Sequence, residues 1–461
     1  MAPSSSTLTS AAVRGVQWTT AASVTNAVLQ IGYTAVMARL LDPAAFGLVA
    51  MAGLVLRFGS YFAEMGLGHA LVQRAEITKQ DIRAAFTASL GLGLGVAALA
   101  WVLAPLAVVF LRNEAVVPLV RLQALGFVLV GLSTTAVSVL RREMRFDAIA
   151  KVEVAAYVFG YGGVGVGMAW AMQAGYLPIA GVWSLIAASL AQQFFVMVLS
   201  YALVRHSVRF IFGWAAYAPL LGYGGRMSVI SFLEFVNGNL DTLLIGRLLG
   251  STLLGIYNRA YMLLYLPMYF LTNSLARVAF PTFSKIQTDL PRVRALYLTS
   301  STLVATLVLP LCAGVAVAAP EMVRVLLGPR WAASVPVLRV LCLSIPLSMT
   351  TLFAGVVADA RANLRQKVLL NIEFMLLLTA LFWLLKGYGL VGIAAAIGTG
   401  EVVRTFLYMR VTHHDIGLGY GRLLAMYLPG LFNAAVVGVS ILAVSVLLRA
   451  GAIPPLVGWA A

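Results

Sequence analysis

The stretch Arg39-Leu-Leu-Asp-Pro-Ala-Ala-Phe-Gly-Leu-Val-Ala50 lies between two long apolar runs, and a related stretch returns in the second half of the chain. The second copy is Arg247-Leu-Leu-Gly-Ser-Thr-Leu-Leu-Gly-Ile-Tyr-Asn258. Both copies start with Arg-Leu-Leu, and 208 positions separate Arg39 from Arg247 and Gly47 from Gly255. Apolar segments flank both copies. The repeat predicts two related halves of about 200 residues each, and chance matching in apolar sequence is the alternative.

The composition places the chain in a membrane. Of its 461 residues, 61% are hydrophobic and 10% are charged, whereas soluble domains carry about 25% charged residues. Apolar runs recur along the whole chain and are long enough to cross roughly 30 Å of hydrocarbon as helices. None of them alternates as barrel strands would. The sequence therefore predicts an all-α polytopic membrane protein.

Thirteen membrane spans are expected. They are 16–38, 44–66, 84–110, 116–140, 148–172, 178–204, 219–245, 252–280, 296–319, 333–358, 366–386, 389–410 and 423–448. The expected domains are an N-lobe of six helices, a cytoplasmic linker, a C-lobe of six helices, and an extra helix with a short tail: 1–204, 205–218, 219–411 and 412–461. The tail after Arg449 is too short for a fourteenth span.

The distribution of Lys and Arg predicts the orientation. Nineteen of them fall in the loops of one side, and seven fall on the other: Arg39, Arg112, Arg247, Arg324, Arg330, Lys386 and Arg449. Short cytoplasmic loops are rich in Lys and Arg, so the N-terminus is expected inside the cell and residue 461 outside. Residues 1–13 lack the basic start and apolar core of a signal peptide, which predicts that the first span is retained.

The number of spans fixes the symmetry that the repeat predicts. Six spans precede the second copy, so both copies enter the membrane in the same direction. Two six-helix lobes related by a pseudo-twofold axis along the membrane normal follow, as in transporters built from parallel repeats.

Other classes of protein find little support. The net charge of +16 is spread over short loops rather than clustered, which argues against nucleic-acid binding. There is no P-loop for ATP, no catalytic constellation, and no expected metal or cofactor. His413-His414-Asp415 reads as a solvated loop, and the Gly-rich run 160–167 as close helix packing within the fifth span. Cys312 and Cys342 both lie in apolar runs, so no disulfide framework is expected.

Arginines inside the spans are the first candidate site residues. Ionisable groups are costly in lipid and tend to face a cavity or a partner. Arginine also binds phosphate through a planar fork of donors. The candidates for an anionic substrate are Arg57, Arg121, Arg259 and Arg339. The alternative is that they pair with and neutralise carboxylates such as Glu64, Glu153, Glu234 and Glu373.

The seventh span is the most polar. Glu234, Asn237 and Asp241 share one helical face, and Asn26, Gln30 and Tyr33 do so in the first span. A hydrophilic cavity between the lobes is one interpretation, and interhelical hydrogen bonding is the other. Asn26 and Asn237 join the substrate-binding candidates. Asp241, Glu234 and Glu64 are the candidates for cation coupling, because burial can push a carboxyl pKa toward neutral.

Short motifs in a fixed order resemble a known family. They are Arg14-Gly15 with Trp18, Ala38 to Pro43 with Phe46-Gly47, Phe62 to Gly66 with Gln73-Arg74, Asn239-Leu240-Asp241, Ile245-Gly246-Arg247, Gly255 to Tyr261, Phe280-Pro281 with Lys285, and Gly328-Pro329-Arg330-Trp331. Over residues 14 to 425 the chain resembles the polysaccharide transporter family of the multidrug/oligosaccharidyl-lipid/polysaccharide flippase superfamily, in particular Wzx-type exporters of the colanic-acid kind.

The resemblance implies a MATE-like, two-lobed flippase for undecaprenyl-diphosphate-linked oligosaccharides in the bacterial inner membrane. Its partners would be the lipid-linked oligosaccharide, membrane lipid, and a polysaccharide polymerase and export complex. Such proteins usually have fourteen spans, so thirteen spans here put the completeness of the C-terminus in question. The alternatives are a multidrug/cation antiporter of the same superfamily and a membrane scaffold that docks polysaccharide enzymes.

Overall fold

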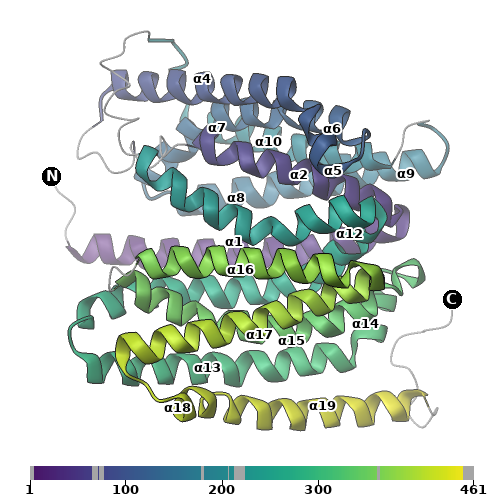
Figure 1. Cartoon of the computed structure of the whole chain (residues 1–461). Helices are drawn as coiled ribbons and strands as arrows, with labels where there is room; N and C mark the ends of the chain where they lie inside the picture. Colours follow the sequence, from purple (N-terminus) through teal and green to yellow (C-terminus); the bar gives the residue numbers. More distant parts are fainter. Residues whose placement is uncertain are drawn as a thin grey trace. The chain divides into compact units, whose positions relative to one another are not determined.

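A computed structural model of the chain describes residues 5–64, 71, 77–177, 181–205, 207–211, 224–360 and 364–449. In these ranges all regular secondary structure is helical (Figure 1), as the sequence predicted. The chain divides into two compact units, residues 1–255 (unit 1) and 256–461 (unit 2). The division follows Gly255. Most of the predicted linker 205–218 and the tail 450–461 lie outside the described residues, so the predicted domain boundaries stay predictions.

Unit 1 is a bundle of helices that begins with α1 (Ser5–Leu40) and α2 (Pro43–Glu64). The others are α4 (Lys79–Leu103), α5 (Leu106–Leu111), α6 (Val116–Gln123), α7 (Leu125–Arg142), α8 (Phe146–Tyr157), the π-helix η1 (Val158–Val166), α9 (Gly167–Gln173), α10 (Val182–Val204) and the first part of α12 (Gly224–Ile286). Gly250 breaks α12 with φ of 82°. This break lies between the predicted seventh and eighth spans.

Unit 2 holds the rest of α12 and a second set of helices. They are α13 (Leu290–Val317), α14 (Ala319–Leu326), η2 (Pro329–Trp331), α15 (Ser334–Ala360), α16 (Leu364–Leu385), η3 (Lys386–Tyr388), α17 (Gly389–Ile416), α18 (Tyr420–Ala425) and α19 (Leu428–Arg449). α13 packs against α15 and α19, and α17 against α15 and α16. Cβ atoms added at Gly314 and Gly430 would meet α19 and α13 respectively, so the two helices approach closely. The last helix is thereby an integral part of unit 2.

Nine helices of the described residues are long and apolar enough to cross a membrane, and Pro43–Arg57 is a shorter apolar helix. These nine helices do not correspond one to one with the thirteen predicted spans. One of the nine, Leu369–Ile416, has 48 residues and extends over two predicted spans. At 1.5 Å per residue it measures roughly 72 Å, more than two hydrocarbon thicknesses. η3 and a φ of 62° at Gly389 interrupt it, at the predicted boundary between spans 366–386 and 389–410. The exact count stays a prediction.

The predicted span 84–110 differs from the structure. The run 84–110 was expected to be a single helix, but α4 ends at Leu103 and α5 begins at Leu106. Pro105 lies at the break, where it has no amide hydrogen to continue the helical ladder. The apolar side chains on either side gave a continuous hydrophobic signal, which hid the turn.

Small residues bring the helices of unit 1 together. A Cβ atom at Gly93 of α4 would lie 2.5 Å from the Phe127 carbonyl oxygen of α7, and one at Gly131 of α7 would lie 2.6 Å from that of Ser89. On the glycine-rich η1, a Cβ at Gly160 would lie 2.6 Å from the Cα of Gln192 on α10. Close approach at small residues is how membrane helices pack without a hydrophobic driving force. The packing interpretation of the Gly-rich run 160–167 is confirmed.

The two copies of the repeated motif meet inside unit 1. A Cβ atom added at Gly47 would collide with the carbonyl oxygen of Ser251, and one added at Gly255 would collide with that of Pro43. Pro43 and Ser251 are repeat mates, and so are Gly47 and Gly255. The contact is therefore reciprocal, as in an interface with local twofold symmetry. Both copies also begin a helical segment after a break, at Pro43 and after Gly250, which supports the equivalence predicted from sequence.

Candidate functional site

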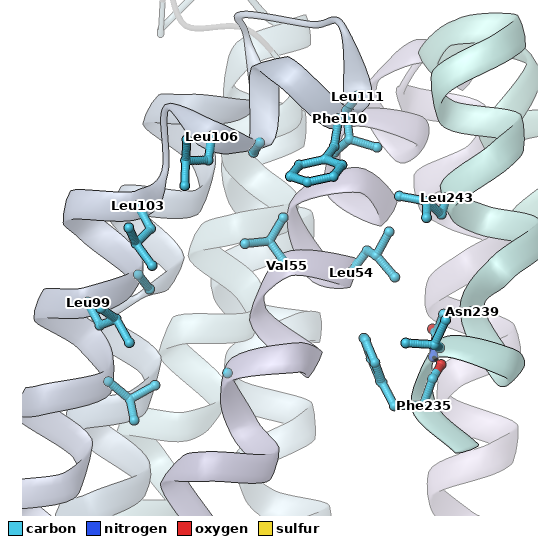
Figure 2. Close-up of a pocket in the computed structure, with 15 residues that line it drawn as sticks. Leu54, Val55, Leu99, Leu103, Leu106, Phe110, Leu111, Phe235, Asn239 and Leu243 are labelled. Carbon is cyan, nitrogen blue, oxygen red and sulfur yellow. Dashed lines mark hydrogen bonds between the residues drawn. The ribbon is translucent and has the colours of Figure 1, made fainter. Parts of the chain in front are cut away.

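An apolar cavity of about 480 Å³ opens between α2, α4, α5 and α12 of unit 1. Figure 2 shows side chains from all four elements converging on it: Leu54 and Val55 from α2, Leu99 and Leu103 from α4, Leu106, Phe110 and Leu111 from α5, and Phe235, Asn239 and Leu243 from α12. Cavities that hold small ligands have volumes of roughly 300–1,000 Å³. We call this cavity the apolar groove.

The wall of the groove is hydrocarbon with one exception. Asn239 is the single polar side chain among the lining residues, and its amide nitrogen donates to the Phe235 carbonyl of its own helix at 2.9 Å. That bond satisfies a donor which would otherwise face apolar surroundings. Leu99 and Phe110 are 57% and 58% exposed, so the groove is open along α4 and α5.

The predicted spans 44–66, 84–110 and 219–245 place the groove at bilayer depth. Along α2 its lining residues lie roughly 17–24 Å from Pro43, and along α12 roughly 10–22 Å from Gly250, at about 1.5 Å per residue. A hydrocarbon core is about 30 Å thick. In this placement the exposed leucines of α4 and α5 face lipid chains, and the groove opens into the hydrocarbon region.

One charged residue lies on each of α2 and α12 at the level of the groove. Arg57 stands two residues from Val55 and from Gly59 but three residues after Leu54, and all three line the groove. Asp241 stands two residues from each of the lining residues Asn239 and Leu243. Residues two apart along an α-helix point to roughly opposite sides, whereas residues three apart lie about 60° from each other around the axis. Arg57 therefore lies beside Leu54 at the edge of the lining face of α2, and Asp241 lies on the face of α12 that is turned away from the groove.

The contacts of Arg57 and Asp241 are partly local. Arg57 donates through Nε to the Gly53 carbonyl, one turn earlier, at 3.3 Å. Asp241 is half-buried, and its Oδ1 accepts from the Thr242 amide at 2.6 Å. An arginine and a carboxylate at this depth are costly in lipid unless they face a partner or a polar cavity, which keeps both residues as site candidates.

Arg121 and Arg339 occupy corresponding places in the two units. Arg121 of α6 donates through Nε to the Trp101 carbonyl in the last turn of α4 at 3.4 Å, and its guanidinium lies 4.4 Å from the Trp101 ring centroid. Arg339 of α15 donates through Nε to the Ala316 carbonyl in the last turn of α13 at 3.2 Å. Cations near the last carbonyls of a helix complement its dipole. Both arginines therefore have a structural task at a helix end.

The remaining candidates differ in how much of their surroundings the structure describes. Arg259 belongs to unit 2, is half-buried, and donates through Nη2 to Asn258 Oδ1 at 3.2 Å. Asn26 of α1 is half-buried, and its enclosed Oδ1 has no hydrogen-bond partner among the described residues. The side chains of Glu64, Glu234 and Asn237 lie outside the described part of the structure. Glu401 and Arg404, two further ionisable residues of a span, form an ion pair at 3.0 Å within α17.

Arg247, the first residue of the second motif copy, supports the groove. Its Nη1 donates to the carbonyls of Val109 and Phe110 at 2.9 and 2.8 Å. These carbonyls end α5, where Arg112 takes a left-handed conformation with φ of 53°. Phe110 also lines the groove. Arg247 thus holds the short helix that forms one wall, a role that the repeat alone did not indicate.

Replacing Arg247 with alanine is expected to destabilise unit 1. Two charge-assisted hydrogen bonds to the end of α5 are lost, and because the site is partly exposed we expect a cost of about 1–2 kcal/mol. A lower midpoint of thermal unfolding of the purified protein would show it. The control is Arg324→Ala, at an exposed arginine of the short helix α14. Equal midpoints for both variants and the wild-type chain would contradict the capping role.

The groove-lining residues were missed by sequence reasoning. Leu99, Leu103, Leu106 and Phe110 read as ordinary members of one apolar span. Pro105 was the available signal, since it predicts a turn and hence a short separate helix. The partner walls on α2 and α12 are far away in sequence and carried no local signal.

The fold and the depth of these groups define a class, a multi-pass helical membrane protein with an apolar groove and intramembrane arginines. Two solved structures share the fold. The lipid II flippase MurJ, in an inward closed conformation, aligns with a TM-score of 0.65 at 11% identity over 95% of this chain and 98% of that one. An inward-facing multidrug resistance MATE family transporter of the MOP superfamily aligns with a TM-score of 0.65 at 16% identity, over 84% and 94% of the chains.

Sequence comparison gives the family. The family described as polysaccharide biosynthesis protein matches residues 36–336, and the chain belongs to it. A curated relative is the lipopolysaccharide biosynthesis protein WzxC of Escherichia coli K12, 26% identical over 335 residues. The match covers 72% of this chain and 66% of WzxC, so the chain spans just under two thirds of that relative's length. The family predicted from the short motifs is confirmed.

Proposed function

We propose that this protein is a flippase that moves undecaprenyl-diphosphate-linked oligosaccharide repeat units across the bacterial inner membrane by alternating access. Membership of the polysaccharide biosynthesis protein family supports the proposal, as does the fold shared with a lipid II flippase. The observation that carries it is an apolar surface, the groove, with a cationic residue, Arg57, at its α2 edge. A substrate with a long hydrocarbon tail and an anionic diphosphate requires such a pair of surfaces.

The headgroup is assigned to the arginines within the spans. A guanidinium donates in a planar fork that matches phosphate geometry. Arg57 and Arg259 are the main contacts in this proposal, because Arg121 and Arg339 already bind the ends of neighbouring helices through Nε. Arg121 and Arg339 would contribute through their remaining N–H donors. Asn26 and Asn237 would contribute amide hydrogen bonds to sugar hydroxyls.

The driving cation is assigned to carboxylates. Asp241 on α12, with Glu234 and Glu64, would bind a proton or sodium ion as the conformations alternate. In this proposal the chain transports without catalysing a reaction, the N-terminus is cytoplasmic, and a polysaccharide polymerase and export complex receive the product.

Complementation tests this function. The chain is expressed in a strain lacking its exopolysaccharide flippase, and secreted polymer and drug sensitivity are both measured. Restored polymer with unchanged drug sensitivity is expected. Restored drug resistance without polymer would contradict the proposal and identify an antiporter.

A further inference from the structure

We propose that the isoprenoid tail of the carrier lipid lies in the apolar groove formed by α2, α4, α5 and α12 while the diphosphate is held by Arg57 at the α2 edge of the groove. The inference rests on the proposed function and adds a specific place for the tail. None of the site residues predicted from the sequence lines this groove.

The chemistry of the wall selects the occupant. Fourteen of the fifteen lining residues carry no polar side-chain group, and the amide of Asn239 is bonded to its own helix. A sugar or a diphosphate there would leave its polar groups without hydrogen-bond partners, which is strongly unfavourable. Hydrocarbon is the one part of a lipid-linked oligosaccharide that this surface accepts.

The position of the groove admits a chain from the membrane. Leu99, Leu103, Leu106 and Phe110 are exposed on α4 and α5 at the depth of the hydrocarbon core. A tail enters sideways from lipid and needs no passage through the bundle. At about 480 Å³ the groove holds a segment of a long isoprenoid, so the rest of the chain stays in the bilayer.

The geometry of α2 joins the tail to the headgroup. Arg57 lies about 60° around the helix from the lining residue Leu54 and less than one turn along it. A lipid whose tail lies in the groove therefore has its first polar atoms within one helix diameter, about 10 Å, of Arg57. A lipid that carries an anionic diphosphate next to a long hydrocarbon tail satisfies both the groove and this arginine.

Photolabelling locates the tail. A photoreactive benzophenone amino acid replaces Leu103, which lines the groove, or its neighbour Val102, which is exposed and does not. The full-length protein is placed in phospholipid nanodiscs containing undecaprenyl diphosphate, irradiated, and analysed by mass spectrometry. We expect isoprenoid adducts at position 103 several-fold above those at position 102. Equal adducts at both positions, or phospholipid adducts alone at 103, would overturn the inference.

A variant that fills part of the groove tests the same inference by the retention of the carrier lipid. Leu103→Trp occupies part of the groove, whereas Val102→Trp adds the same bulk outside it. Excluding two or three methylene groups should weaken retention of undecaprenyl diphosphate about tenfold or more in Leu103→Trp only. Retention equal to that of Val102→Trp would count against the groove. Labelling confined to position 103 supports the groove even if the wild-type chain fails to restore polymer export, and that failure would overturn the proposed function instead.

Discussion

Gly47→Ala is expected to destabilise the protein and to abolish polymer export, because the added methyl group collides with the backbone of the second motif copy. The atom it meets is the carbonyl oxygen of Ser251. This oxygen belongs to the backbone, so no side-chain rotation can relieve the collision. Overpacking of a tight contact costs on the order of 1–3 kcal/mol. Gly255→Ala introduces the mirror collision with the Pro43 carbonyl and should act in the same direction.

The control variant is expected to change the stability in the opposite direction. Gly91 of α4 has open space around an added Cβ, so Gly91→Ala should stabilise its helix by about 0.5–1 kcal/mol. Thermal unfolding of the purified variants separates the two cases. Because Gly47 and Gly255 share one contact, the double variant should lose less than the sum of the single losses. Unfolding of Gly47→Ala at the wild-type temperature would refute the reciprocal contact.

Removing the guanidinium of Arg57 or Arg259 is expected to have the second large effect, on substrate binding. A hydrogen bond to a charged group contributes about 1.5–3 kcal/mol, which corresponds to a factor of roughly 10 to 100 in affinity for the diphosphate. Arg57→Ala and Arg259→Ala should therefore reach the membrane at normal levels and lose polymer export. Arg57→Lys should restore little, because lysine lacks the planar fork.

Arg292→Ala is the matched control for the loss of a guanidinium. Arg292 is exposed at the start of α13, in a surface ion pair with Asp289 at 3.2 Å, and such pairs contribute about 0–1 kcal/mol. Binding of undecaprenyl diphosphate to the purified variants, with export measured in parallel, checks the prediction. If Arg57→Ala and Arg259→Ala both bind and export like Arg292→Ala, the headgroup assignment is wrong.

The features that sequence predicted well have local or periodic signals. Long apolar runs indicated the helices, and a fixed offset of 208 positions paired Gly47 with Gly255. The glycines of 160–167 indicated close packing, which the contact of Gly160 with Gln192 confirms. What the repeat did not predict is that its two copies touch each other, because self-complementary contact is a property of the folded backbone.

The features that sequence missed depend on neighbours from distant segments. The groove needs α2, α4, α5 and α12 together, and no one of these carries an unusual pattern. Pro105 was a real signal for the separate helix α5, but the apolar run on either side concealed it. An arginine in a span can face a polar cavity, or it can donate to the carbonyls at the end of a neighbouring helix. The sequence does not distinguish these two cases. Arg121 and Arg339 illustrate the second outcome.

The most direct test of transport is a flipping measurement with the purified chain. Proteoliposomes receive a fluorescent undecaprenyl-diphosphate-linked oligosaccharide in one leaflet, and its appearance in the other leaflet is followed with a membrane-impermeant quencher. We expect protein-dependent translocation that Arg57→Ala and Arg259→Ala abolish and Arg292→Ala leaves intact. Translocation no faster than in protein-free liposomes, with protein that still binds the lipid, would contradict it.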